Sequence, residues 1–372
     1  MNSSDSRAPL AGLKVVEFAA LGPAPFCTML LADFGADVIR IDKPGADVYS
    51  PANVVFRGRP SVELDLKTPE GIEAALRIVD KADILIEGFR PGVMERLGLG
   101  PEVVQVRNPR IVYGRMTGWG QTGPRAREPG HDINYIGLVG ALHSIGTEAS
   151  PVIPTNLVGD FGGGALYLAF GILAAVLDAQ QTGRGHVIDC AMVDGVASLM
   201  TMVYGWLSTG YWLDSRCSNS VDGGSHFYNV YECACGKWLA VGAVEPKFYA
   251  ELLRGMDLDP AQFPQRERSR WPELRAEFAR VFKRRTRQEW LEIFAGKEAC
   301  VTPVHSMREA MEDPHVRSRG IFGTRQGVPQ PMPAPRLSGY TVAEPAGVSM
   351  AGEGGAAALA RWGLDPDSII HA

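Results

Sequence analysis

Two short segments of this sequence carry side chains that could transfer protons. Residues 130–135 read GHDINY and place His131 beside Asp132, and residues 156–164 read NLVGDFGGG and place Asp160 among glycines. A histidine and a carboxylate can act as two bases of different type, one removing a proton from a carbon and the other returning a proton on the opposite face. Each residue also has a plainer explanation, because Asp160 could be only a helix N-cap and His131 a hydrogen-bonded core histidine.

The glycines next to Asp160 affect what the backbone can do there. Residues without a Cβ let the backbone approach a ligand closely and leave N–H groups free to face a developing oxyanion. The apolar run from Ala165 to Leu177 predicts a helix, so we expect Asp160 near a helix N-terminus, where negative charge is favoured. The run Gly164–Leu177 is shorter than the ~20 residues that cross a bilayer, so we expect a buried helix there.

The elements that must position these groups alternate in type along the first half of the chain. Short β-branched runs alternate with helical patterns, which predicts a parallel sheet with helices on its faces. The expected strands are residues 13–18, 37–41, 84–86, 111–116 and 186–190, and the expected helices are residues 25–34 and 69–81, the latter capped by Thr68. A long apolar helix is expected over 191–206.

The second half has a different pattern. Residues 227–232 and 238–244 alternate like the strands of a hairpin, and Thr286 with Glu289 forms a capping-box pattern at the start of a helix. Residues 317–345 are rich in glycine and proline and are expected to be a connector that leads back to the first part of the chain.

Composition limits the class of protein. The chain has 372 residues, 45% of them hydrophobic, which is enough for two domains with a substantial core. A net charge of -5 gives no footprint for nucleic acid or an anionic membrane. The six cysteines are scattered, without paired spacing for zinc, and residues 1–9 lack an apolar signal core. We therefore expect a reduced, cytoplasmic protein without a metal site.

One segment imitates a cofactor motif. Gly118–Gly123 has the G-x-G-x-x-G spacing of dinucleotide-binding loops, but Pro124 follows at once and the next residues are polar, including Arg125 and Arg127. A strand-ending acid ~20 residues later, which would hold a ribose, is also missing. The context argues against a nicotinamide cofactor.

Several segments together resemble a known family. The runs GHDINY, NLVGDFGGG and GAVEP (residues 242–246) are similar to those of the α-methylacyl-CoA racemase family, a branch of the class III CoA-transferase (CaiB/BaiF) superfamily. The likeness covers nearly the whole chain. Its other parts are PLAGLKVVE (9–17), LADFGADVIRID (31–42), EGFRPGV (87–93), MTGWGQTGP (116–124) and PAPR (333–336).

The resemblance implies an architecture. A large Rossmann-like CoA-binding domain would span residues 1–190 and be completed by 335–372, with a helical linker at 191–221. A smaller inserted α+β domain would span 222–325, followed by a return linker at 326–334. The resemblance also implies two chains threaded through each other as an interlocked homodimer.

The resemblance also implies roles for single residues. Glu245 of the GAVEP run would come from the small domain and act as partner of His131, while Asn156 and Asp132 would orient His131 or hydrogen-bond the substrate. Arg40 and Arg96 match nucleotide-phosphate contacts. The stretch with Val55, Phe56, Arg57 and Arg59 would lie against the adenine of CoA, and Arg90 is a further basic candidate after a strand.

The implied activity is interconversion of 2R and 2S epimers of 2-methyl-branched acyl-CoA thioesters, by α-proton removal and return and without metal or organic cofactor. Two alternatives stay open. A class III CoA-transferase would use Asp160 as a nucleophile that forms an acyl anhydride, and a non-catalytic protein would only bind acyl-CoA. The acyl group is left open among fatty, steroid or bile-acid and arylpropionyl chains.

Overall fold

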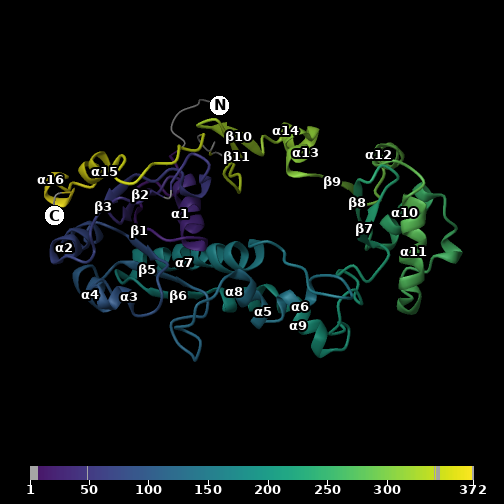
Figure 1. The fold of residues 1–372 in the computed structure, drawn as a ribbon, viewed down its shortest axis with the longest axis horizontal. Coiled ribbons are helices and arrows are strands. Elements are labelled where there is room, and N and C mark those ends of the chain that lie inside the picture. Colours follow the sequence, from purple (N-terminus) through teal and green to yellow (C-terminus); the bar gives the residue numbers. More distant parts are fainter. Residues whose placement is uncertain (1–6, 48, 339, 341–343, 371–372) are drawn as a thin grey trace. The chain divides into compact units, whose positions relative to one another are not determined.

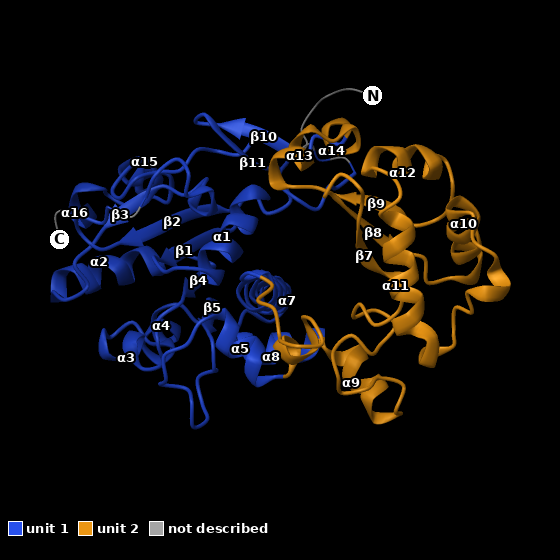
Figure 2. Ribbon diagram, turned by 45° about the vertical axis from the view of Figure 1, so that its right-hand side comes forward, with its two compact units in different colours: residues 1–139, 155–199, 319–372 blue, residues 140–154, 200–318 orange. Residues whose placement is uncertain are grey.

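The structure is a computed structural model that describes residues 7–47, 49–338, 340 and 344–370. Residues 1–6 and 371–372, on which the expected localisation partly depends, lie outside the described residues. The chain forms two compact units, coloured separately in Figure 2: unit 1 comprises residues 1–139, 155–199 and 319–372, and unit 2 comprises residues 140–154 and 200–318. The segment 191–221, predicted as a helical linker, contributes one helix to each unit.

Unit 1 is built on a parallel sheet, as predicted. In the described part of the chain the sheet has six strands in the order β3-β2-β1-β4-β5-β6, the strand order of Rossmann folds. The strands are β1 (Lys14–Phe18), β2 (Asp37–Asp42), β3 (Ser61–Glu63), β4 (Ile84–Glu87), β5 (Val112–Thr117) and β6 (Val187–Ala191). The five predicted strands are confirmed within two residues, and the short edge strand β3 was not foreseen.

Two hydrophobic cores cover the two faces of this sheet. Successive residues of a strand face opposite sides, so Val15 packs in one core and Val16 in the other. The first core is completed by α2, α15 and α16, and the second by α1 and α7 (Figure 1). The helices of unit 1 are α1 (Pro23–Asp33), α2 (Pro69–Val79), α3 (Val93–Arg96), α4 (Pro101–Arg107), α5 (Asp132–Leu138), α7 (Leu166–Thr182), α8 (Met192–Leu199), α15 (Gly355–Arg361) and α16 (Asp367–Ile370), with a short 3₁₀ turn at Val54–Phe56.

Local sequence signals explain where several elements begin. The Thr68 hydroxyl accepts the backbone N–H of Gly71 at 3.0 Å and caps α2 as predicted. The expected helix at 191–206 is interrupted at Met200, which divides it into α8 and α9 (Thr201–Ser208). The expected connector at 317–345 contains a hairpin of β10 (Phe322–Arg325) and β11 (Val328–Pro331), which belongs to unit 1.

Unit 2 combines an antiparallel sheet with helices. The predicted hairpin is present as β7 (Tyr228–Glu232) and β8 (Trp238–Gly242), and β9 (Val301–Val304) pairs with β8 as an unpredicted third strand. An aromatic core lies between this sheet and the helices. The helices are α6 (Ala141–Ser144), α9, α10 (Pro246–Met256), α11 (Trp271–Phe282), α12 (Arg287–Phe294), α13 (Met307–Glu312) and α14 (Pro314–Ser318), with 3₁₀ turns at Pro260–Gln262 and Arg268–Arg270. Thr286 and Glu289 form the predicted capping box of α12.

The helix that carries Asp160 differs from the prediction. A π-helix, Leu157–Ala165, runs without a break into α7, and the combined 26 residues, with a mean hydropathy of 1.7 over their most apolar stretch, are long and apolar enough to span a membrane. Core helices of soluble proteins have the same length and composition, and 39% of that stretch is buried within the chain. The expected buried helix is buried only in part within this chain: Leu168 and Ile172 are buried, whereas Phe170 and Leu177 are 75% and 62% exposed.

Candidate active site

A cavity of about 740 Å³ lies at the carboxyl ends of β1, β4 and β5, entirely within unit 1. Its walls come from the segments that follow these strands, with residues 20–23, 88–91 and 117–119, and from His131, Tyr135, Asn156 and Asp160. In open parallel sheets the strand order reverses between two neighbours, here β1 and β4, and ligands bind in the crevice at that point. The structure thus brings the two predicted bases to the edge where a ligand is expected.

His131 is the N-cap residue of α5. Its backbone N–H donates to Oδ1 of Asn134 at 3.0 Å. This hydrogen bond fixes the start of the helix and the backbone from which the His131 side chain extends. Gly130 lets the backbone before His131 pack against the Tyr135 ring, because a Cβ on residue 130 would lie 2.8 Å from that ring. The GHDINY segment is therefore a helix start that projects His131 into the cavity.

Asp132 connects the two catalytic segments. Its carboxylate is buried, and Oδ2 accepts the backbone N–H of Asp160 at 2.8 Å. The contact requires glycine at position 159, since a Cβ there would lie 2.4 Å from the same oxygen. Asp132 thus holds the backbone that carries Asp160, which is a more specific role than the predicted orientation of His131.

Asp160 lies in the first turn of the π-helix, near the helix N-terminus as predicted. The Asn156 amide donates to its Oδ2 at 3.1 Å. Burial raises the pKa of Asp160 above its ordinary value; the Asn156 hydrogen bond lowers it, the charge of Asp132 raises it and that of His131 lowers it. His131 and Asp160 are therefore close enough to influence each other electrostatically across the cavity.

The expectation that the glycines leave N–H groups free is corrected by the π-helix. In such a helix each N–H binds the carbonyl five residues earlier, so residues 162–164 use their N–H groups within the helix. Their lack of side chains serves packing instead. A Cβ on Gly163 would lie 2.6 Å from Val196 of α8, and a Cβ on Gly164 would lie 2.9 Å from Met192.

Two aromatic residues of the site were not predicted. Tyr135 is buried with its ring edge-to-face with Trp119, at a centroid distance of 4.7 Å, and both line the cavity. Burial raises the pKa of Tyr135, the nearby Asp160 raises it further, and Arg90 lowers it. The signal was available, because both residues lie within the motifs GHDINY and GWGQTG.

The candidate CoA-binding residues fall into two groups. Arg90 lines the cavity and Arg96, at the end of α3, is exposed, while Val55 is half-buried. Lys43, which sequence reasoning overlooked, is exposed and directly follows β2. These side chains could meet a ligand at the sheet edge without rearrangement of the fold.

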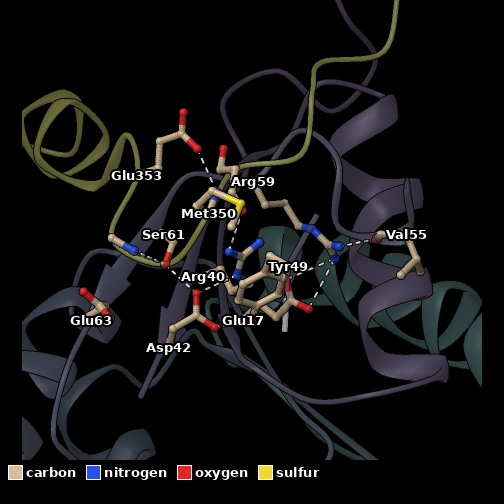
Figure 3. A network of polar contacts seen from close by, with 12 residues as sticks. Glu17, Arg40, Asp42, Tyr49, Val55, Arg59, Ser61, Glu63, Met350 and Glu353 are labelled. Carbon is tan, nitrogen blue, oxygen red and sulfur yellow. Dashed lines mark hydrogen bonds and ion pairs between the residues drawn. The ribbon is translucent and has the colours of Figure 1, made fainter. Parts of the chain in front are cut away.

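The second group is buried and engaged in the fold. Arg40 is 0% exposed, its Nε donates to Asp42 Oδ2 at 2.8 Å, its Nη2 donates to the Ser349 carbonyl at 3.0 Å, and its guanidinium lies 4.0 Å from the Tyr49 ring centroid. Figure 3 shows this network, in which Arg59 binds Glu17 and the Val55 carbonyl.

Arg57 and Phe56 are also buried, and Arg57 forms a two-fold ion pair with Asp33 and hydrogen bonds to Gln330 and Pro331. The predicted contacts of Arg40, Phe56, Arg57 and Arg59 with CoA stay predictions. Arg40, Phe56 and Arg57 contact the C-terminal segment at Ser349, Val348 and Gln330, whereas Arg59 binds Glu17, Pro25 and Val55.

Glu245 is exposed at the N-cap position of α10 and belongs to unit 2. Its predicted pairing with His131 of unit 1 stays a prediction. The described residues contain no group of three or more His, Cys, Asp or Glu side chains arranged to hold a metal ion.

Known proteins are similar to this chain in sequence and in fold. The model of CoA-transferase family III matches residues 10–351. The chain is 43% identical over 367 residues to alpha-methylacyl-CoA racemase of Mus musculus, covering 97% of this chain and 95% of the mouse protein. It is 45% identical over 332 residues to alpha-methylacyl-CoA racemase of Homo sapiens, covering 88% and 86% of the two chains.

A CoA-transferase and a protein of known crystal structure are similar to this chain at lower sequence identity. The alpha subunit of succinyl-CoA–L-malate CoA-transferase of Chloroflexus aurantiacus is 30% identical over 360 residues, covering 89% of this chain and 83% of that protein. A crystal structure of a CaiB/BaiF family protein from Brucella suis is similar with a TM-score of 0.81 at 25% identity, covering 95% of this chain and 99% of that one. The chain therefore belongs to CoA-transferase family III.

Proposed function

We propose that this protein is an α-methylacyl-CoA racemase, which interconverts the 2R and 2S epimers of 2-methyl-branched acyl-CoA thioesters. The observation that carries the proposal is that His131 and Asp160, two bases of different type, line one cavity at the ligand-binding edge of the sheet. Sequence identities of 43% and 45% to two proteins named alpha-methylacyl-CoA racemase support the same activity.

The reaction needs two proton transfers at one carbon. One base takes the C2 proton, the electrons of the C–H bond move to the thioester oxygen as an enolate, and the conjugate acid of the other base protonates C2 on the opposite face. Burial raises the pKa of Asp160, which makes its carboxylate a stronger base toward a weakly acidic carbon. No metal or organic cofactor takes part in the proposed scheme.

The surrounding residues control the position of these bases. Asn156 holds one carboxylate oxygen of Asp160, and Asp132 holds its backbone N–H. The positive end of the π-helix, close to Asp160, would stabilise the enolate oxygen by its dipole.

The remaining parts of the proposal come from the family resemblance. Arg40, Arg96 and the basic candidate Arg90 would contact CoA phosphates, and Glu245 would act as partner of His131. Lys43, which is not part of the resemblance, is a further candidate because it is exposed and directly follows β2. The smaller unit would be an inserted domain of an interlocked homodimer in the cytoplasm. Light scattering after gel filtration tests the dimer, because a mass of one chain would contradict it.

The activity is tested by isotope exchange. The dialysed, chelator-treated protein is incubated with single epimers of several 2-methylacyl-CoAs in D₂O, and deuterium at C2 is followed by mass spectrometry or NMR. Racemisation with exchange is expected, and it should be lost in His131→Ala and in Asp160→Ala by at least the ~10²-fold typical of a missing general acid or base. A requirement for an added nucleotide cofactor or metal would contradict the proposal.

The transferase alternative makes a different chemical prediction for Asp160. A nucleophilic carboxylate forms an acyl anhydride, which hydroxylamine or borohydride traps as a mass change on the peptide that contains Asp160. A base leaves no adduct. We expect no adduct, and trapped acyl-Asp160 together with CoA transfer to a free carboxylate would favour the transferase.

A further inference from the structure

A short loop after β4 forms one wall of the active-site cavity. It comprises residues 88–91, and Arg90 is the one arginine or lysine among the described residues that line this cavity. Arg90 is also close enough to lower the pKa of Tyr135. The position of this loop therefore fixes where the cavity presents its positive charge.

Glu87, the last residue of β4, holds this loop from below. Its Oε2 accepts the backbone N–H of Phe89 at 2.7 Å, and its Oε1 accepts a hydrogen bond from Arg115 Nε at 3.0 Å. On the other side, Gly88 lies so close to α1 and the residues before it that a Cβ would lie 3.0 Å from the Cβ of Ala20 and 3.3 Å from that of Ala24 in α1. The loop is thus held on one side by the Glu87 carboxylate and on the other by close packing of Gly88 against Ala20 and Ala24.

A simple stabilising ion pair does not account for Glu87. Its side chain is fully buried, and removing a carboxylate from water costs more than an ion pair usually returns. Arg115 already has a second carboxylate partner, because its Nη1 and Nη2 donate to Glu95 at 2.7 and 3.2 Å. What Glu87 adds is an acceptor for the Phe89 N–H, directly beside the cavity wall.

We infer that Glu87 is a positioning residue of the active site: by holding the Phe89 N–H it sets the loop that presents Arg90 to the anionic part of an acyl-CoA substrate. Glu87 does not touch substrate and acts through Arg90. The inference rests on the proposed function, since it needs an anionic ligand in this cavity.

The test is a double-mutant cycle between Glu87→Gln and Arg90→Ala, read out by KM and kcat of C2 exchange and by the Kd of CoA in calorimetry. The glutamine amide of Glu87→Gln has one acceptor oxygen for two donors, and because Arg115 is charged the oxygen pairs with Arg115 Nε and leaves the Phe89 N–H without an acceptor. Each single variant should raise KM and the Kd of CoA by about tenfold, the effect of one charge-assisted hydrogen bond, and change kcat by less. In the Arg90→Ala background, Glu87→Gln should add nothing, because the group through which it acts is gone.

Glu95→Gln is the matched control. It removes the other carboxylate partner of Arg115, at a side chain that is 46% exposed, and leaves the Phe89 N–H acceptor in place. Its KM should equal that of the wild type. Equal KM increases in Glu87→Gln and Glu95→Gln, full additivity in the cycle, or a wild-type KM in Glu87→Gln would each overturn the inference.

The same measurements separate the inference from the proposed function. If the wild-type protein exchanges no C2 proton, the proposed function fails, while the Kd of CoA still reports whether Glu87 acts through Arg90. Melting curves of the wild type and the four variants identify any variant that does not fold. If Glu87→Gln does not fold, Glu87→Asp replaces it, because it keeps the charge but shortens the reach to Phe89. An unchanged Kd of CoA in Glu87→Asp would overturn the inference.

Discussion

Adding one methyl group at position 159 should inactivate the site. In Gly159→Ala the new Cβ would lie 2.4 Å from Asp132 Oδ2 and 2.8 Å from its Cγ, whereas ordinary van der Waals contact begins at 3.4 Å. The carboxylate must retreat by about 1 Å, which stretches the 2.8 Å bond from the Asp160 N–H beyond hydrogen-bonding range. Asp160 then loses the contact that fixes its backbone.

The expected magnitude follows from this displacement. Misplacing a catalytic group by about 1 Å costs on the order of 10²-fold in rate, and loss of a hydrogen bond to a charged group costs about 1.5–3 kcal/mol. We therefore expect kcat for C2 exchange to fall about 100-fold in Gly159→Ala, with a smaller change in KM. The assay is deuterium incorporation at C2 of a single epimer in D₂O.

Gly171→Ala is the matched control for this variant. Gly171 lies in α7, continuous with the same helix, and its Cβ would meet Ile188 at 3.4 Å, an ordinary contact. It should keep full activity and gain stability from helix propensity, about 1 kcal/mol at most. In an Asp132→Ala background, Gly159→Ala should cost little more, since the clashing group is gone. A wild-type exchange rate in Gly159→Ala would refute the proposed role of Asp132.

The remaining predictions concern stability and the other site residues. Burial, followed by the charge of Arg270, lowers the pKa of His226 from 6.5 to about 4. The imidazole of His226 therefore binds a proton more readily in the unfolded chain than in the folded chain. Its contribution to the free energy of unfolding is complete above pH 6.5 and should fall by about 3 kcal/mol as the pH decreases to 4. Denaturant melts of the wild type and His226→Gln at both pH values measure this loss, and an equal pH dependence of the two proteins would contradict it. Arg40→Lys should lower the melting temperature, because a lysine cannot reproduce the contacts to Asp42 and Ser349; a higher KM for acyl-CoA at an unchanged melting temperature would instead place Arg40 on a phosphate. Glu245→Gln should lower kcat and alter the limb of the pH–rate profile that reports His131, and full activity with an unchanged profile would make Glu245 a surface residue.

The local elements and the two candidate bases could be predicted from the sequence alone. The neighbours Val15 and Val16 of β1 are both apolar because a parallel strand is buried on both faces. A cap such as Thr68 accepts an N–H group within three residues of itself. Strand patterns and helix caps depend on residues that are close in sequence, so they can be recognised without knowledge of the fold. The same holds for His131 and Asp160, whose motifs are each contiguous.

Tertiary structure alone decided what surrounds those elements. The sequence places Arg40 at the end of a strand, but only the fold shows that it is buried and that the carbonyl of Ser349, 309 positions later in the chain, accepts a hydrogen bond from its guanidinium. The glycines after Asp160 were expected to leave backbone N–H groups free, but they form a π-helix against which α8 packs. Glu87 gave no signal, since its burial and the hydrogen bond that it accepts from Arg115 of the neighbouring strand exist only in the folded chain. In each case the deciding contact joins segments distant in sequence, and burial, which sets the cost of a charge, exists only once those segments have packed.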